Sequence, residues 1–479
     1  MLRIFNTLGR EEQVFKPINE GEISFYHCGP TVYWTQHIGN MRAMVMGDLI
    51  RRSLIYLGYD VNYVSNYTDF GHLTSDGDEG EDKMEKGAKR EGLTPKEIAD
   101  KYIKEFEIDV KALNILNPTT RARATDYINQ MIEMVQTLLD KGFAYSTPTA
   151  IYFDITKFPD YTKLSGQNLD MNKSGEGHGD VLDSENKKNP QDFALWFFRT
   201  GVHKNALQYW PSPFKSPEVE NGNGFPGWHI ECSAMVKALL GNSIDIHMGG
   251  IEHIPIHHTN EIAQSESANG VKYVNYWLHN EHLDVDGTKM SKSLGNVYNV
   301  SSLIEKGYYP LFLRFFFLQA HYRSKQNFTM EALDAAKSAY LRLKNFANEW
   351  SRNIGDNSSI NATPDENLKS KFTEALEDDF NIPQALAVAW EVTKGDLSDQ
   401  IKAVTLQDFD KVLGLNLFLQ SENPADLELP TEVKILLDER NLARINKDWQ
   451  KSDEIRDQLE KEFGIKVKDT EKGQEASKL

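Results

Sequence analysis

The architecture of this chain is specified by residues 22–64, which read EISFYHCGPTVYWTQHIGNMRAMVMGDLIRRSLIYLGYDVNYV. Residues 22–26 form a short, largely apolar run typical of a strand, and apolar side chains then recur at helical spacing over 39–57. Residues 61–64 indicate a second strand after Gly58. A strand–helix–strand order predicts a doubly wound parallel sheet with helices on both faces, so the predicted fold class is α/β.

The remainder of the chain shows several further patterns. Apolar residues recur at helical spacing in three segments, 121–141, 303–350 and 366–415. Alternation over 243–247, followed by two glycines at 249–250, predicts another strand. Residues 166–190 are polar and rich in Gly, Asn and Lys, which predicts a long loop in an inserted region. Asn, Ser, Asp and Pro concentrate over 354–366, where a domain boundary is expected.

Composition limits the classes of protein to consider. The chain has 479 residues, 40% of them hydrophobic and 26% charged, which suits about three globular domains of ~150 residues each. Its apolar runs are far shorter than the ~18 residues of a membrane span, so no membrane association is expected. Two cysteines and a strand-like N-terminus favour a cytoplasmic location. The net charge of −18 argues against nucleic-acid binding without excluding it, because binding depends on local basic patches.

The two cysteines lie where a metal site could form. Cys28 follows the first predicted strand, at the end of the sheet where ligands bind in such folds, and Cys232 lies far downstream. His257 and Glu261 are four residues apart and share one face of a helix, although spacing allows His258 equally well. Two thiolates, an imidazole and a carboxylate suit a tetrahedral zinc site. The alternatives are two buried thiols in an ordinary core, or a disulfide, which the low cysteine count disfavours.

Two short motifs suit a polyphosphate. His37-Ile38-Gly39-Asn40 lies at the start of the first predicted helix, where free N–H groups and the helix dipole favour phosphate. Lys289-Met290-Ser291-Lys292-Ser293 follows a glycine-containing turn, so its lysines could close over leaving pyrophosphate. Taken singly, the first motif could be a surface turn and the second a solvated basic loop.

Together these motifs resemble the HIGH and KMSKS signatures of class I aminoacyl-tRNA synthetases. The stretches 28–33 (CGPTVY) and 227–235 (GWHIECSAM) resemble the cysteinyl-tRNA synthetase family in particular. The resemblance is dense over 1–70 and 225–320, and it returns near the C-terminus. It implies a Rossmann-like doubly wound parallel-sheet catalytic domain with an inserted connective region, followed by a helical domain and a small C-terminal anticodon-binding unit.

The resemblance also implies domain boundaries. Residues 1–115 and 223–300 are expected to form the two halves of the catalytic domain, with the connective insertion at 116–222 between them. The remaining parts are expected to be a stem-contact helical region, a helical bundle and an anticodon-binding unit, at 301–353, 354–425 and 426–479.

The resemblance assigns roles to individual residues, in four groups. The zinc ligands are expected to be Cys28, Cys232, His257 and Glu261, which selects His257 over His258. The catalytic residues are expected to be His37, Asn40, Lys289 and Lys292. ATP is expected to contact Thr31, His37, Gly39, Asn40, Gly249, Glu252, Met290 and Lys292. Cysteine is expected to contact Cys28, Gly29, Thr68 and Trp228, and the anticodon Arg444, Asp453 and Asp469.

The implied activity is that of a ligase. L-cysteine would react with ATP, accompanied by Mg²⁺, to give cysteinyl-adenylate and pyrophosphate, and then pass to the 3′-terminal ribose of tRNA(Cys). One zinc ion per chain would bind the substrate thiolate and so reject serine, because a thiolate is a much better zinc ligand than a hydroxyl. The chain is expected to be a monomer.

The sequence departs from the family pattern at Asn40, which replaces the second histidine of HIGH, and at an insertion over 215–224. One alternative function is an ATP-dependent cysteine ligase acting on an amino-sugar acceptor. Such proteins lack the anticodon-binding region, so residues 366–479 argue against it. A catalytically silent RNA-binding paralogue is the other alternative. It is suggested only by Asn40 and opposed by the complete lysine and zinc-ligand sets.

Overall fold

A computed structural model describes residues 1–71, 82–167, 187–290, 296–354, 362–419, 431–445, 448–463, 465–470 and 473–478. These residues form two compact units, Met1–Leu415 and Asn416–Leu479. None of the described helices is both long and apolar enough to cross a membrane.

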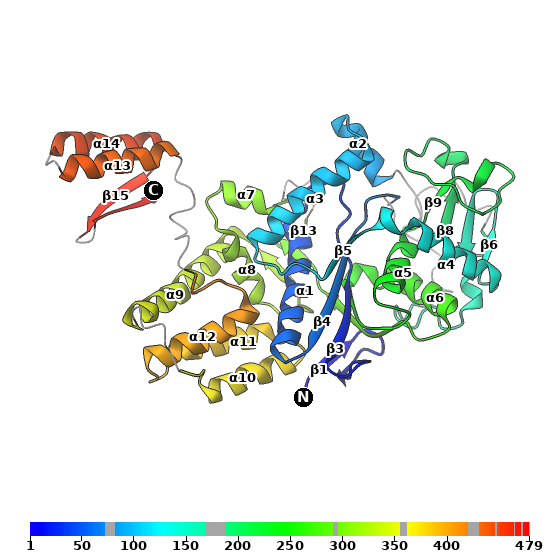
Figure 1. Cartoon of the computed structure of the whole chain (residues 1–479), viewed down its shortest axis with the longest axis horizontal. Coiled ribbons are helices and arrows are strands. Elements are labelled where there is room, and N and C mark those ends of the chain that lie inside the picture. The colour runs from blue at the N-terminus through cyan, green and yellow to red at the C-terminus, as the bar shows by residue number, and fades with distance from the viewer. Residues whose placement is uncertain are drawn as a thin grey trace. The chain divides into compact units, whose positions relative to one another are not determined.

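A parallel sheet of five strands forms the centre of the first unit (Figure 1). Its order is β11 (Val274–Asn280), β10 (Ile244–Gly250), β3 (Glu22–His27), β4 (Asp60–Tyr67) and β5 (Thr120–Arg123). All four neighbouring pairs run parallel. The chain moves from β3 to β4 on one side, whereas β10 joins β3 on the other. Such a reversal opens a crevice at the carboxyl ends of the strands, where ligands bind.

The predicted strand–helix–strand unit is confirmed. Strand β3 covers 22–27, helix α1 spans Ile38–Tyr56, and β4 covers 60–67. The strand predicted at 243–247 is β10. The helix predicted over 121–141 is wrong in its first third, because Thr120–Arg123 pairs with β4 as an edge strand and only Ile128–Asp140 forms helix α4. The backbone groups of Thr120–Arg123 form hydrogen bonds with β4. These residues are therefore a strand, although their apolar spacing predicted a helix.

An antiparallel sheet lies in the inserted region. Its strands, in spatial order, are β6 (Ala144–Ser146), β7 (Ala150–Phe153), β8 (Phe193–Phe198) and β9 (Gly224–Pro226). Every residue of β8 is buried, in keeping with its unbroken apolar sequence FALWFF. The long loop predicted over 166–190 lies largely outside the described residues, since 168–186 are not described.

Strand β9 sets the start of helix α5 (Trp228–Leu239). Between them, Gly227 approaches β8 so closely that a Cβ there would lie 2.1 Å from the carbonyl oxygen of Ala194. Real side chains do not approach backbone so closely, so the position requires glycine. The inserted sheet therefore fixes the start of α5, the helix that carries Trp228 and Cys232.

The helical segment predicted over 303–350 is interrupted by a strand. Helices α7 (Val300–Glu305), α8 (Pro310–Leu318) and α9 (Met330–Ile354) form as expected. Between α8 and α9, strand β14 (Gln326–Phe328) pairs in parallel with β12 (Leu283–Val285), which also pairs with β13 (Thr288–Lys289). The pattern missed β14 because three residues are too few to show a period.

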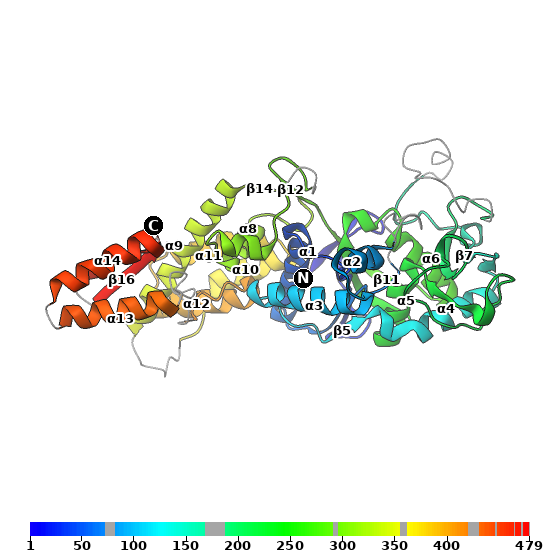
Figure 2. The same ribbon diagram turned by 90° about the horizontal axis from the view of Figure 1, so that it is seen from above.

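A helical region follows. It contains α10 (Glu366–Glu377), α11 (Ile382–Val392) and α12 (Asp399–Leu413), which confirm the helices predicted over 366–415. Figures 1 and 2 both show these helices side by side. Two further helices, α2 (Lys83–Glu91) and α3 (Pro95–Ala112), lie between β4 and β5, and a short hairpin of β1 (Arg3–Asn6) and β2 (Glu11–Val14) opens the chain.

A buried ionic cluster ties this helical region to α1. Arg314 of α8 is 0% exposed, and its guanidinium lies 2.7 Å from the Oδ2 atom of Asp48 on α1. Arg52, one turn further along α1, lies 2.8 Å from the same oxygen. Arg314 also donates to the carbonyl of Leu413, and Arg52 to that of Lys411, both on α12. Arginines of α1 and α8 therefore share one carboxylate of α1, and both also donate to carbonyls of α12.

The second unit is small and has its own core. Helices α13 (Thr431–Ile445) and α14 (Trp449–Phe463) pack with a hairpin of β15 (Ile465–Thr470) and β16 (Gly473–Lys478). Buried apolar residues join these elements: Val433, Ile455, Leu459, Ile465 and Val467. The α/β fold class, with its insertion, helical region and small C-terminal unit, is thus confirmed.

Candidate functional site

The candidate site begins at the carboxyl end of β3. Cys28 is buried there, and its backbone N–H donates to the carbonyl of Met248 on β10 at 3.0 Å. The N–H of Gly29 donates to Asn66 Oδ1 at 2.8 Å. A Cβ on Gly29 would lie 1.6 Å from the carbonyl oxygen of Asn66. The loops after β3 and β4 therefore approach so closely that only glycine fits, and this approach turns Cys28 toward the crevice.

Helix α6 (His257–Asn269) brings further ligand-type side chains to Cys28. Ligand atoms of Cys28, His257, His258 and Glu261 all lie within 4.8 Å of one another, and all four residues are buried. Glu261 Oε1 lies 3.0 Å from His257 Nε2 and forms an ion pair with that imidazole. A thiol, two imidazoles and a carboxylate so close together are ligand types that zinc prefers, so this donor set fits a metal ion.

The other oxygen of Glu261 is held from behind. Tyr273 donates its hydroxyl to Oε2 at 3.0 Å, and His247 Nε2 lies 3.0 Å from the same atom. Such outer contacts orient a carboxylate and leave its other oxygen, Oε1, beside His257. Further buried histidines contact the group: His229, His247 and His279. The sequence analysis named none of these as a site residue. For His247, the sequence did hold a signal, because the alternation over 243–247 predicted the strand on which it lies.

Cys232 lies on α5 next to this group. Its thiol hydrogen-bonds with that of Cys28, but it is not one of the four residues within 4.8 Å. Burial raises the pKa of the Cys28 thiol, yet the bond from Cys232 and nearby imidazoles, His247 first among them, outweigh burial and hold that pKa well below its usual value. The hydrogen bond to Cys28, with burial, raises the pKa of Cys232. The two thiols therefore shift each other's pKa in opposite directions, and that of Cys28 is the one lowered.

The charges of His257 and Glu261 are coupled. Burial raises the pKa of the Glu261 carboxyl, but His247 and His257 outweigh burial and lower it. Burial lowers the pKa of His257, whereas Glu261 raises it, to a net value of about 10. Burial lowers the pKa of His258 to about 3, so this ring is neutral. A thiolate and a carboxylate together supply the anionic charge that suits a divalent cation, and such a cation would displace the His257 proton.

Trp228 and Thr68 adjoin this group from two sides. The Trp228 ring stacks on that of His257, with centroids 4.1 Å apart and planes at 18°. Thr68 follows β4, pairs with Thr31, and donates its hydroxyl to Glu231 Oε2 at 3.1 Å. Of the predicted cysteine-contact residues, Gly29 and Thr68 therefore lie with Thr31 in the loops after β3 and β4, whereas Trp228 opens α5 beside His257.

The two predicted nucleotide motifs touch each other. His37 caps α1, and its Nδ1 atom accepts from the backbone N–H of Asn40 at 3.2 Å. A Cβ on Gly39 would lie 2.6 Å from the Met290 Cε atom. The start of α1 is thus covered by the methionine of the second motif. Lys289 ends β13, whereas Lys292 lies outside the described residues.

A buried arginine that the sequence analysis missed fixes this contact. Arg42 of α1 is 1% exposed and lies 3.2 Å from Gln326 Oε1 on β14. It also donates to the carbonyls of His321 and Ser324, just before that strand. Because β14 pairs with β12, which carries β13, Arg42 ties the helix of the first motif to the sheet that leads into the second.

The predicted adenosine loop lies at the end of β10. A Cβ on Gly249 would lie 2.7 Å from ring atoms of both His253 and His258, so glycine lets this backbone approach the histidines. Glu252 follows in a short 3₁₀ turn, about half exposed, with one carboxylate oxygen 3.7 Å from His282 Nδ1. This exposed carboxylate stands at the rim of the crevice.

The predicted anticodon residues lie in the second unit. The Arg444 guanidinium lies over the Trp449 ring, 5.8 Å from its centroid, and Trp449 is 57% exposed. Asp453 is exposed on α14 and pairs with Arg456 at 3.2 Å. Asp469 lies on β15. An exposed tryptophan beside an arginine is a suitable platform for an unstacked base.

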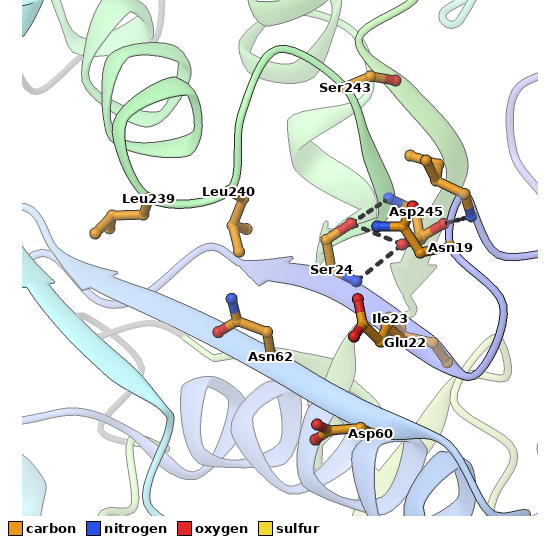
Figure 3. A pocket seen from close by; sticks show the side chains of 11 residues that line it. Asn19, Glu22, Ile23, Ser24, Asp60, Asn62, Leu239, Leu240, Ser243 and Asp245 are labelled. Carbon is orange, nitrogen blue, oxygen red and sulfur yellow. Dashed lines mark hydrogen bonds between the residues drawn. The ribbon is translucent and has the colours of Figure 1, made fainter.

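A pocket of about 370 Å³ lies at the opposite, amino end of the central sheet (Figure 3). It is lined by the starts of β3, β4 and β10. The carboxylate of Asp245 accepts from the backbone and hydroxyl of Ser24, at 2.8 and 2.7 Å, and from the Ile18 N–H. Both carboxylate oxygens of Asp245 are therefore hydrogen-bonded to residues of the fold. The candidate site remains the crevice around Cys28.

Comparison with known proteins identifies the family. The family model described as "tRNA synthetases class I (C) catalytic domain" matches residues 14–338. The chain belongs to the cysteinyl-tRNA ligase family. In keeping with that family, the "Cysteinyl-tRNA ligase anticodon binding domain" matches residues 426–476, and a "DALR domain" matches 371–395.

Relatives of this family member are similar over nearly the whole chain. Cysteine–tRNA ligase 1 of Burkholderia lata is 42% identical over 474 residues, which cover 99% of this chain and 96% of the relative. The cysteine–tRNA ligase of Treponema denticola is 41% identical over 492 residues, covering 98% of each.

Solved structures show the same fold at low sequence identity. The LeuRS of Agrobacterium radiobacter, in a ternary complex with tRNA and LeuAMS, has a TM-score of 0.62 at 12% identity and covers 84% of both chains. Mycobacterium tuberculosis methionyl-tRNA synthetase, with methionyl-adenylate, has a TM-score of 0.56 at 17% identity and covers 82% of this chain and 90% of its own. This family member thus has the class I synthetase fold.

Proposed function

We propose that the chain activates L-cysteine with ATP and transfers it to the 3′-terminal ribose of tRNA(Cys). The observation that carries this proposal is the meeting of two features in one crevice. A buried Cys28–His257–Glu261 group lies just after β3, and the Gly39–Met290 contact lies at the start of α1, the helix that follows β3. The first suits recognition of a thiol, and the second suits a polyphosphate. Charging of a tRNA(Cys) transcript with cysteine, compared with a tRNA(Ser) transcript, tests the proposal.

We propose zinc as the metal, held by Cys28, Cys232, His257 and Glu261. The buried sulfur, imidazole and carboxylate atoms of Cys28, His257 and Glu261, all within 4.8 Å of one another, support this choice, because Zn²⁺ prefers such ligands. Bound zinc would supply a soft cation for the substrate thiolate. Recognition by sulfur would discriminate against serine far better than an apolar pocket can discriminate between near-isosteres.

The residues of the two motifs would position ATP. The start of α1 presents backbone N–H groups toward phosphate, with Gly39 allowing close approach, and His37 and Asn40 beside it. The carboxylate of cysteine attacks the α-phosphorus of ATP, the bond to pyrophosphate breaks, and cysteinyl-adenylate forms. Lys289 and Lys292 are proposed to neutralise the charge that develops on the pyrophosphate oxygens, with Mg²⁺ accompanying ATP. Thr31, Gly249, Glu252 and Met290 are proposed to contact the nucleotide.

Replacing Lys292 with alanine is expected to lower the rate of cysteine-dependent ATP–pyrophosphate exchange by about 10²–10³-fold, the usual effect of losing one charge-stabilising donor. The KM for cysteine should change little, because the lysine is proposed to contact the pyrophosphate oxygens as they leave and not the cysteine. Lys306→Ala, at the exposed end of α7, is the matched control and should retain full activity. Equal losses in rate and in cysteine binding would mean that the lysine has a structural role only.

The C-terminal unit would read the anticodon. Arg444, Asp453 and Asp469 are proposed to contact anticodon bases, supported by the exposed Arg444–Trp449 platform. Arg444→Ala is expected to raise the KM for tRNA(Cys) about 10-fold or more, since base stacking and base-edge contacts are each worth roughly 1–3 kcal/mol. Pyrophosphate exchange, which needs no tRNA, should be unchanged. Lys461→Ala on the same unit serves as control, and an unchanged KM for Arg444→Ala would exclude this residue from the interface.

The alternative activity, joining cysteine to an amino sugar, receives less support. The match of an anticodon-binding family model to residues 426–476 favours tRNA as the acceptor. The proposed partners are therefore tRNA(Cys), ATP and L-cysteine. A monomer in the cytoplasm is proposed as the acting form, as the family resemblance implies.

A further inference from the structure

Arg42 of α1 is a buried cation that is hydrogen-bonded to segments far from it in the sequence. Its guanidinium donates, at 2.5–3.2 Å, to four acceptors among the described residues: the carbonyls of Glu281, His321 and Ser324 and the side-chain oxygen of Gln326. Burial lowers the pKa of Arg42 to about 10, against the opposing effect of Glu281, so the side chain stays protonated at neutral pH. Burying a charge costs free energy, which these charge-assisted hydrogen bonds offset.

The segments that Arg42 binds lead into one small sheet, of β13, β12 and β14. Glu281 comes just before β12, and Ser324 just before β14, the strand that pairs in parallel with β12. Strand β12 continues into β13 through a two-residue turn, Asp286-Gly287, in which both residues have positive φ, as tight hairpins require. The backbone N–H groups of this turn donate to residues of β14 at 2.8 and 3.0 Å. The hairpin and β14 are therefore fastened together as one unit.

The residue that follows this hairpin reaches the first motif on α1. Met290 comes directly after β13, and its Cε atom lies so near Gly39 that a Cβ there would be 2.6 Å away. Gly39 and Arg42 are three residues apart on α1 and so share one face of the helix. Arg42 thus holds the sheet against the face of α1 that Met290 covers. The approach of Met290 to the start of α1, where ATP is proposed to bind, depends on this anchor.

We propose that Arg42 positions the nucleotide site: by fixing the sheet of β12–β14 on α1, it sets how closely Met290 approaches Gly39 and hence how ATP fits between the two motifs. The inference rests on the proposed function, since it assumes that this crevice binds ATP. Arg42 is a positioning residue and not a catalytic one, because its buried guanidinium acts through the sheet. Lysine cannot replace it, since a compact ammonium cannot reach acceptors that the broad, five-donor guanidinium spans.

Cysteine-dependent ATP–pyrophosphate exchange by the zinc-loaded full-length protein tests this inference. Arg42→Lys keeps the charge and loses most of the hydrogen bonds. It is expected to lower kcat/KM for ATP about 10- to 100-fold, as when reacting groups are misplaced by about 1 Å. The KM for cysteine should change less than about twofold, and zinc stoichiometry should equal that of the wild type, because the Cys28 site does not depend on this anchor.

Arg314→Lys is the matched control. Arg314 is equally buried and also contacts α1 and a backbone carbonyl, but it meets α1 at Asp48, more than two helical turns beyond Gly39. This variant should lose stability and yet keep both kinetic constants. A general loss of packing would therefore be separated from a displaced nucleotide site.

A double-mutant cycle with Met290→Ala tests whether Arg42 acts through Met290. Met290→Ala alone is expected to lower kcat/KM for ATP, and the same change in Arg42→Lys should lower it several-fold less, since residues that act through one contact are not additive. Losses that multiply independently, or no loss in Met290→Ala, would overturn the inference while leaving the proposed function standing.

Gln326→Met provides a second test if Arg42→Lys does not fold. It removes one of the four acceptors with little change in side-chain length, and it should lower kcat/KM for ATP about 3- to 10-fold without changing the KM for cysteine. An unchanged kcat/KM for ATP, or a KM for cysteine that rises as much as kcat/KM for ATP falls, would overturn the inference. If the zinc-loaded wild type catalyses no cysteine-dependent exchange, the proposed function itself fails, and the inference fails with it.

Discussion

Cys28→Ser is expected to lose zinc and to lose cysteine activation almost completely. The thiol lies within 4.8 Å of ligand atoms of His257 and Glu261, and its pKa is held well below the usual value. A serine hydroxyl stays protonated and is a poor ligand for zinc. Substituting a residue that hydrogen-bonds to a metal ligand typically costs about 10–100-fold in metal affinity or activity. Loss of a ligand itself should cost more.

The measurements are zinc content after dialysis and the rate of cysteine-dependent pyrophosphate exchange. His257→Gln should behave like Cys28→Ser. His258→Gln is the matched control, because spacing alone allowed either histidine and the proposal selects the first. It should retain zinc. Stoichiometric zinc in Cys28→Ser would contradict the ligand assignment, and loss of zinc in His258→Gln with retention in His257→Gln would reverse the choice of imidazole.

Arg314→Met is expected to destabilise the first unit by about 3–5 kcal/mol, as for removal of one partner of a buried ion pair. Burial raises the pKa of the Asp48 carboxyl, but the charges of Arg314 and Arg52 outweigh burial and hold that pKa below the ordinary aspartate value. The variant leaves Asp48 buried with one cation fewer. It also removes a donor from the backbone carbonyl of Leu413. Helices α1 and α8 would lose the contact that they share at this carboxylate.

Urea unfolding followed by tryptophan fluorescence checks this expectation. Arg352→Met, which replaces an exposed arginine on α9, is the control and should change the free energy of unfolding by less than ~0.5 kcal/mol. The depressed pKa of Asp48 stabilises the wild type fully above the ordinary aspartate pKa of about 3.9, and this stabilisation is lost as the pH falls through the lower, folded-state pKa. The difference between wild type and Arg314→Met should therefore be constant near neutrality and shrink in acid. A difference below ~1 kcal/mol at pH 7 would mean that the cluster contributes little.

Sequence patterns predicted the elements whose period is long enough to measure. Helix α1 has five turns of apolar residues, and the strands on either side are bounded by loops, so all three were found. The error at Thr120–Arg123 has the opposite cause. Four residues beside a strongly amphipathic helix carry no period of their own, and only pairing with β4 makes them a strand. Strand β14 was missed for the same reason.

Interactions between distant residues were not predictable from spacing. Arg314 interrupts an apolar run, LFLRFFFL, and so resembles a break between hydrophobic segments. Its partner, Asp48, lies 266 positions away. The same holds for the candidate site. Helical spacing was enough to place His257 and Glu261 together, and the structure has them 3.0 Å apart, but only the fold brings Cys28 to them.

The most direct test of the central claim is cysteine-dependent ATP–pyrophosphate exchange by the full-length protein, with serine as the competing amino acid and a zinc chelator as a second arm. The account predicts exchange with cysteine, none with serine, and loss of the activity on chelation with recovery when zinc is restored. Exchange that persists without zinc, or that serine supports equally well, would contradict it.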